Sequence, residues 1–191
     1  MSGRLESVLT AIDSVNAADP TLESDGETKK PAALLYGQRM SAELSRVCPE
    51  ASENLQIAAR GQHIERWKMA RSSYPEGRTG YLKWRKAQAA FHGGRAAGLM
   101  AEAGYPESDG LRVASMLRKE GIKRDAEVQM LEDVICLVFL RWYFADFSKG
   151  RDPEQVFGIV GKTARKMSAE GRARVATEFD LPAELVPALS V

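Results

Sequence analysis

The chain of 191 residues contains few histidines and cysteines, two of each. Cys48 and Cys136 lack the close spacing of metal-binding cysteines, and Cys136 lies in an apolar run, which indicates a small core residue without a disulfide partner. No apolar segment follows Met1, so the sequence shows no sign of a secretory signal. From these absences we expect a cytoplasmic protein.

Long hydrophobic runs are also missing. The longest apolar stretch, "VICLVFLRWYFADF" from Val134 to Phe147, is too short to span a bilayer and contains Arg141, which favours a buried core helix. Hydrophobic residues make up 44% of the chain and charged residues 28%, which is ordinary for a soluble globular protein. We therefore expect no membrane association.

The alternation of apolar and polar residues that marks strands is nearly absent, whereas helical periodicity is frequent. We expect long helices over about 32–47, 50–69 and 78–102, a fourth that starts near Asp125, and a fifth that Asp152 caps. The sequence shows no internal repeat. These patterns predict an all-α single domain over residues 1–191, a helical bundle around one core.

Positive charge is concentrated in one part of the chain. The segment from Arg60 to Arg95 holds nine basic and two acidic residues, so it carries +7 within a chain whose net charge is +1. Such a field favours an anionic partner, either a phosphorylated small molecule or nucleotide or a nucleic acid. The alternative is a basic helix face that is simply solvated.

Polar residues interrupt the apolar faces of three predicted helices. In the first, Gln62 and Arg66 share a face that has His63 at its edge. In the next, a polar line along the helix includes His92, and in the third Asp133 precedes the longest apolar run. Because a buried charge requires a partner, we expect these groups to meet. The residues of this predicted site are Gln62, His63, Arg85, His92, Glu132 and Asp133.

Two imidazoles and a carboxylate suit a divalent metal such as Mn²⁺, Fe²⁺ or Zn²⁺. We therefore predict His63, His92 and Asp133 as metal ligands, with a metal-activated water as the nucleophile. Asp133, Glu132 and Gln62 are the candidate catalytic residues. The alternative is a hydrogen-bonded core in which Arg85 pairs with Asp133 and neighbouring groups satisfy both histidines.

The segment between the two histidine-bearing helices, "ARSSYPEGRTGYLKWR", is rich in arginine. Guanidinium groups suit bidentate recognition of phosphate, although surface salt bridges would use the same residues. Later in the chain, "GKTARKMS" places two lysines on one helix face, without the strand and glycine pattern of a P-loop. The predicted substrate-binding residues are Arg66, Arg71, Tyr74, Arg78, Arg85, Lys162 and Lys166.

Several stretches, in this order, resemble a bacterial and fungal family described as domain of unknown function 4202. They include "AIDSVNAADP", "LLYGQRMSAEL", "LQIAARGQHIERW", "RSSYPEGRTGYLKWR", "VQMLEDVICLVFL" and "KTARKMS". The resemblance covers nearly the whole chain.

The order of polar residues also resembles, more weakly, the HD-type phosphohydrolases. That resemblance implies an HD-like helical core whose metal ligands map onto His63, His92 and Asp133. In the HD pattern an aspartate follows the second histidine, whereas Gly93 and Gly94 follow His92 here. One ligand of the pattern is therefore missing, and Glu132 is the candidate substitute.

Three functions are consistent with the sequence. The first is a metal-dependent hydrolase of phosphorylated small molecules or nucleotides. The second is a non-catalytic module that binds a nucleotide or nucleic acid through the basic 60–95 segment. The third is a scaffold whose basic face meets an acidic protein. Neither the substrate nor the oligomeric state follows from the sequence.

Overall fold

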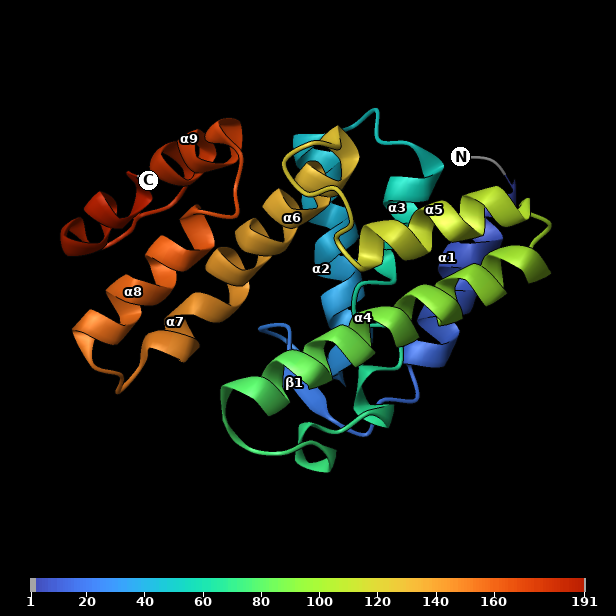
Figure 1. Cartoon of the computed structure of the whole chain (residues 1–191), viewed down its shortest axis with the longest axis horizontal. Helices are drawn as coiled ribbons and strands as arrows, with labels where there is room; N and C mark the ends of the chain where they lie inside the picture. Colours follow the sequence, from blue (N-terminus) through green and yellow to red (C-terminus); the bar gives the residue numbers. More distant parts are fainter. Residues whose placement is uncertain (1–2, 191) are drawn as a thin grey trace. The chain divides into compact units, whose positions relative to one another are not determined.

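Helices dominate the computed structural model, which describes residues 3–190 (Figure 1). Among these residues, the only strands are a short antiparallel pair, β1 (Leu22–Ser24) and β2 (Lys29–Pro31). The prediction of an all-α fold is confirmed. Over the same residues, no helix combines the length and the apolar character that crossing a membrane requires.

Contacts within the chain divide it into two units, Met1–Glu120 and Gly121–Val191. Five α-helices build most of the first unit, and two short 3₁₀ turns, η1 and η2, precede the fourth helix. The five are α1 (Gly3–Asn16), α2 (Ala32–Val47), α3 (Glu53–Arg60), α4 (Gly77–Glu102) and α5 (Glu107–Leu117); the turns are η1 (Arg66–Lys68) and η2 (Arg71–Ser73). The single domain expected over residues 1–191 stays a prediction.

The second unit begins with the predicted helix at Asp125, whose carboxylate accepts hydrogen bonds from the backbone N–H groups of Glu127 and Val128. This helix does not run unbroken through the apolar stretch, because a π-helical turn interrupts it. Asp152 caps a later helix, as predicted. The elements are α6 (Ala126–Val138), η3 (Phe139–Tyr143, the π turn), α7 (Phe144–Ser148), α8 (Pro153–Ala164), α9 (Ala169–Glu178) and η4 (Ala183–Leu189).

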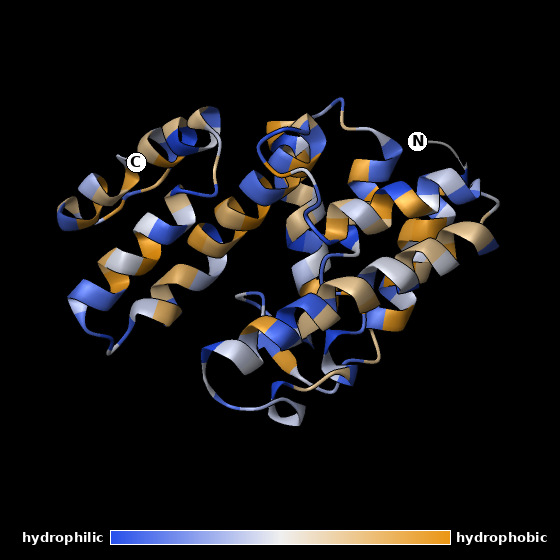
Figure 2. Ribbon diagram, viewed as in Figure 1, coloured by the Kyte–Doolittle hydropathy of each residue, from blue (hydrophilic) through white to orange (hydrophobic). Residues whose placement is uncertain are grey.

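Small residues hold α4 and α5 close together (Figure 1). A Cβ atom at Gly93 would lie 3.0 Å from the Cα atom of Ala114, and one at Gly110 would lie 3.3 Å from the Cβ atom of Ala97. Hydropathy changes from residue to residue along both helices, as expected where one side is buried and the other faces solvent (Figure 2). Gly93, the residue after His92, therefore serves packing, as does Gly110.

The helix predicted over 50–69 is wrong in its second half. The structure ends α3 at Arg60, and the chain turns from Gly61 to Glu65 before η1 begins. Glu65 has φ 50°, a left-handed conformation that costs a non-glycine residue roughly 1–3 kcal/mol. Because apolar spacing continues past Arg60, periodicity alone does not reveal this break.

Substitution of the two adjacent glycines in α4 tests the packing. We expect Gly93→Ala to destabilise the protein by about 1–3 kcal/mol, because its methyl group overpacks against Ala114. The matched control is Gly94→Ala, an exposed helical position with no heavy atom within 4 Å of the added Cβ. That change should stabilise by about 0.5–1 kcal/mol. Denaturant melts of both variants measure the difference, and equal effects at the two positions would contradict the packing.

Candidate functional site

The turn after α3 is held in place by its neighbours. The backbone N–H of Glu65 donates to Asn16 Oδ1 on α1 at 2.9 Å, and Asn16 is itself fully buried. The Glu65 carboxylate, also buried, pairs with Lys68 and with Arg95 on α4. Although burial opposes it, hydrogen bonding to Lys68 and Arg95 holds the pKa of Glu65 below its ordinary value. These contacts offset the strain of the left-handed residue.

Three side chains at four-residue intervals on α4 bind the same turn through its carbonyl groups. Trp84 Nε1 donates to Met69 O at 2.9 Å. Gln88 Nε2 donates to Met69 O at 2.9 Å and to Arg66 O at 3.0 Å. His92 Nδ1 lies 2.7 Å from Ile64 O. Because residues four apart share one helix face, this side of α4 fixes the backbone from Ile64 to Met69.

His63 lies on this turn and meets the second histidine. Its ring stacks on Tyr36 of α2, with ring centroids 3.7 Å apart and planes inclined by 17°. Its centroid lies 6.2 Å from that of His92. The structure therefore brings together the two histidines that the sequence analysis expects in one site.

Both histidines are neutral at pH 7. Burial, reinforced by the charge of Arg66 and by His92, holds the pKa of His63 well below its ordinary value. Burial also lowers the pKa of His92 to about 4, although its hydrogen bond with Ile64 opposes the shift. Since a carbonyl oxygen only accepts hydrogen bonds, Nδ1 of His92 carries the proton and Nε2 carries the lone pair.

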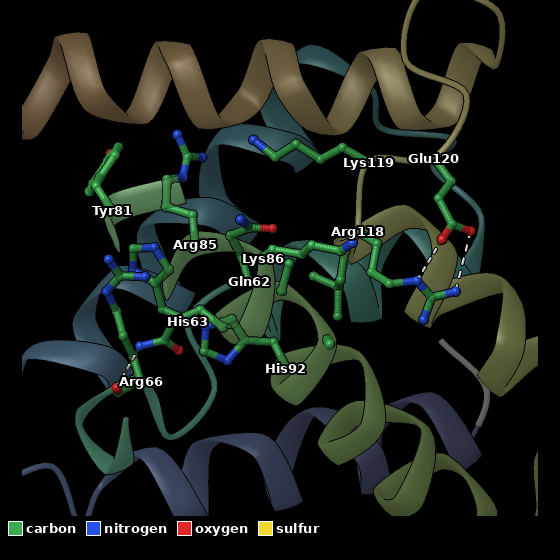
Figure 3. A pocket seen from close by; sticks show the side chains of 14 residues that line it. Gln62, His63, Arg66, Tyr81, Arg85, Lys86, His92, Arg118, Lys119 and Glu120 are labelled. Atoms are coloured by element: carbon green, nitrogen blue, oxygen red, sulfur yellow. Dashed lines mark hydrogen bonds and ion pairs between the residues drawn. The ribbon is translucent and has the colours of Figure 1, made fainter. Parts of the chain in front are cut away.

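A cavity of about 570 Å³ opens beside the histidines, within the first unit (Figure 3). This volume lies in the range of small-molecule sites. The lining comes from the turn after α3, from α4 and from the end of α5. The lining residues are Gln62, His63, Arg66, Tyr81, Arg85, Lys86, Gln88, Ala89, Ala90, His92, Leu117, Arg118, Lys119 and Glu120.

The lining is strongly cationic. It includes five basic side chains and one carboxylate, Glu120, which accepts hydrogen bonds from Arg118. The Arg66 guanidinium lies 4.6 Å from the centre of the Trp84 ring, and that of Arg85 lies 5.9 Å from the centre of the Tyr81 ring. Within residues 3–190, neither arginine forms an ion pair with a carboxylate.

Only some of the predicted substrate-binding residues line this cavity. Arg66 and Arg85 do, as does Gln62, one of the predicted catalytic residues. Arg71 instead donates to the carbonyl oxygens of Tyr74 and Pro75, both at 2.9 Å, and so closes the loop before α4.

The remaining predicted binding residues lie elsewhere. Arg78 is exposed in the first turn of α4 and is not part of the cavity lining. Lys162 and Lys166 belong to the second unit. There, Lys166 Nζ lies 3.9 Å from a carboxylate oxygen of Glu132, which is buried.

Asp133 has partners within its own unit. Its Oδ1 accepts hydrogen bonds from the Ser168 backbone N–H at 2.8 Å and from Gln129 Nε2 at 3.0 Å. Its Oδ2 lies 2.5 Å from the Ser168 hydroxyl, which also caps α9 by accepting from Gly171 N–H. The N-terminus of α9 therefore compensates this buried carboxylate, while the alternative pairing of Asp133 with Arg85, a residue of the other unit, stays a prediction.

The predicted metal site of His63, His92 and Asp133 stays a prediction, because the two histidines belong to the first unit and Asp133 to the second. No three His, Cys, Asp or Glu side chains among residues 3–190 are grouped so that they could hold a metal ion. The position after His92, where the HD pattern has aspartate, is Gly93, and a Cβ there would already press on Ala114. Packing of α4 on α5 therefore disfavours any side chain at this position.

Some cavity residues have no signal in the sequence. Lys86 lies one position after Arg85 on α4, and its place in the lining is visible only once the direction of α4 is known. Arg118, Lys119 and Glu120 follow α5, where Lys119 adopts φ 60°. Their contribution depends on the α4–α5 packing. The glycines at 93 and 110 are the one sequence feature that indicates so close an approach.

The environment of Asp133 predicts a structural role for this residue. Asp133→Asn should destabilise the protein by about 1–3 kcal/mol, because the amide nitrogen replaces an anionic oxygen that accepts from Ser168. The matched change is Ser168→Ala, and the double variant should lose less than the sum of the two single losses. Denaturant melts with and without chelator measure this. A chelator-dependent loss, or additive losses, would contradict the cap.

Comparison with known protein families finds one match, over residues 6–188, to the family described as Domain of unknown function (DUF4202). No curated protein and no solved structure matches the chain. Because the family match covers nearly all of the sequence, the chain belongs to the family of domain of unknown function 4202.

Proposed function

We propose that the first unit binds an anionic small molecule with a phosphate group, a sugar phosphate or a nucleotide, in the cavity between α4, α5 and the turn after α3. The observation that carries this proposal is the pair Arg66 and Arg85. Both line the cavity, and neither has a carboxylate partner among the described residues. Guanidinium groups without an internal counter-ion provide charge-assisted hydrogen bonds to phosphate oxygens.

The way in which the basic segment is used favours a small ligand over a nucleic acid. Arg60 lies 3.4 Å from Asp13, and Lys68 and Arg95 share Glu65, so three of its cations have internal partners. Arg71 binds loop carbonyls. Three other cations of the segment, Arg66, Arg85 and Lys86, line the concave cavity. A nucleic-acid-binding module would instead need an extended row of phosphate contacts.

A phosphohydrolase is the second candidate, and one observation favours it. His92 places a neutral imidazole nitrogen, Nε2, in the lining that also holds the arginines. Such a nitrogen can accept a proton from water as the water oxygen attacks phosphorus, while the ester P–O bond breaks and the solvent protonates the leaving alkoxide. Release of inorganic phosphate from a bound ester distinguishes this enzyme from a binding module.

Two charge-removing variants on α4 test the binding proposal. We expect Arg85→Gln to weaken the binding of ribose 5-phosphate or adenosine 5′-monophosphate by about 10- to 100-fold, because one charge-assisted hydrogen bond is lost. The matched control is Lys83→Gln, which removes the same charge from an exposed position outside the lining. Its effect should stay within about twofold.

Titration calorimetry at two salt concentrations measures these affinities, which should fall as salt rises. Absence of binding by both compounds, or equal losses in the two variants, would contradict the proposal.

A further inference from the structure

The cavity offers hydrogen-bond acceptors as well as cations. Three of its lining residues carry a buried side-chain acceptor with no hydrogen-bond partner in the described structure: Gln62 Oε1, Gln88 Oε1 and His92 Nε2. Gln88 and His92 are nearly inaccessible, with 2% and 3% of their surfaces exposed. Buried polar atoms in proteins normally have partners, so each of these three is an unusual feature that a ligand would explain.

The hydrogen bonds of the turn fix two of these atoms as acceptors. Gln88 Nε2 donates to two carbonyl oxygens, Arg66 O and Met69 O, and thereby uses both of its N–H groups. Its Oε1 is left as the acceptor. His92 donates through Nδ1 to Ile64 O, so its Nε2 is left with a lone pair. Neither assignment can be reversed without placing two acceptors against each other.

A ligand that satisfies these atoms must donate hydrogen bonds. A fully ionised phosphate only accepts them, so the arginines alone would bind it and the three acceptors would remain unpaired. Hydroxyl groups on the carbon skeleton of a phosphate ester donate. They fit a site that offers cations on one set of residues and neutral acceptors on another.

We infer that the ligand is a phosphate ester of a hydroxyl-bearing skeleton, held through its phosphate by Arg66 and Arg85 and through its hydroxyl groups by His92, Gln88 and Gln62. This inference rests on the proposed function and adds the class of ligand. Sugar phosphates and nucleoside phosphates share this chemistry. Tyr81, 43% exposed in the cavity lining, offers a ring on which a base could stack, so the two sources can be separated by experiment.

The test compares ligands with and without hydroxyl groups. In the wild-type protein, ribose 5-phosphate should bind at least about tenfold more tightly than methyl phosphate, since the acceptors contribute only to the first. A second comparison measures the binding of adenosine 5′-monophosphate to the wild-type protein and to the Tyr81→Leu variant. If the wild-type protein binds adenosine 5′-monophosphate more tightly than ribose 5-phosphate, and Tyr81→Leu removes this difference, the ligand is a nucleoside phosphate. If the wild-type protein binds adenosine 5′-monophosphate and ribose 5-phosphate equally well, the ligand is a sugar phosphate.

His92→Asn tests the acceptor directly. The asparagine amide N–H can replace Nδ1–H of His92 as the donor to Ile64 O, whereas nothing replaces Nε2. We expect a loss of about tenfold in the affinity for ribose 5-phosphate and little change for methyl phosphate. Gln62→Met, which removes a side-chain acceptor with no hydrogen-bond partner in the described structure, should act in the same way if the asparagine variant does not fold.

The outcomes separate the inference from the proposed function. If methyl phosphate binds as tightly as ribose 5-phosphate, in a manner that depends on Arg85, the hydroxyl-bearing ligand is overturned and the phosphate site stands. The same follows if neither His92→Asn nor Gln62→Met changes the preference between the two esters. If no phosphate compound binds, both are overturned.

Discussion

The cavity depends on the hydrogen bonds that one face of α4 makes to the turn after α3. Trp84, Gln88 and His92 form hydrogen bonds with the carbonyl groups of Met69, Arg66 and Ile64, which lie in and beside the 3₁₀ turn η1. Each of these hydrogen bonds contributes about 0.5–1.5 kcal/mol to stability. The position of His63 and the orientation of His92 both follow from this contact.

The contact between α4 and the turn gives the site two kinds of polar group, neutral hydrogen-bond acceptors and cations. Gln88 and His92 donate their side-chain N–H groups to carbonyl groups of the turn. Gln88 Oε1 and His92 Nε2 are left as acceptors without a hydrogen-bond partner in the described structure. The cations Arg66 and Arg85 have no carboxylate partner among the described residues, and Glu65, the carboxylate next to Arg66 in the chain, is paired with Lys68 and Arg95. The strained conformation of Glu65 therefore serves the charge of the cavity as well as its shape.

Much of this arrangement could be predicted from periodicity, and the failures have physical causes. The line through Arg85 and His92 on α4 does face the site, because a long helix keeps its faces in register. The helix expected beyond Arg60 fails, because asparagine on α1 and arginine on α4 stabilise a left-handed residue that local sequence disfavours. The hydrogen-bond partner of Asp133 could not be predicted, because Ser168, which caps α9, lies 35 positions away in the chain.

The glycines after His92 show that a sequence motif alone does not reveal the structural role of its residues. In the sequence they are a departure from a metal-binding pattern, and in the structure Gly93 packs so closely on Ala114 of α5 that an added Cβ atom would lie 3.0 Å from its Cα atom. Close approach of these helices brings Lys119 and Glu120 to the cavity. The absence of a carboxylate at this position thus helps to form a site of different chemistry.

The protonation of His92 tests this account most directly, and ¹⁵N NMR can measure it with few overlapping signals, because the chain has only two histidines. We predict that at pH 7 His92 is neutral, with the proton on Nδ1 and a lone pair on Nε2, and that it titrates with a pKa of about 4, lowered mainly by burial. A proton on Nε2 at pH 7, or a His92 that titrates near the ordinary value of about 6.5, would contradict the account.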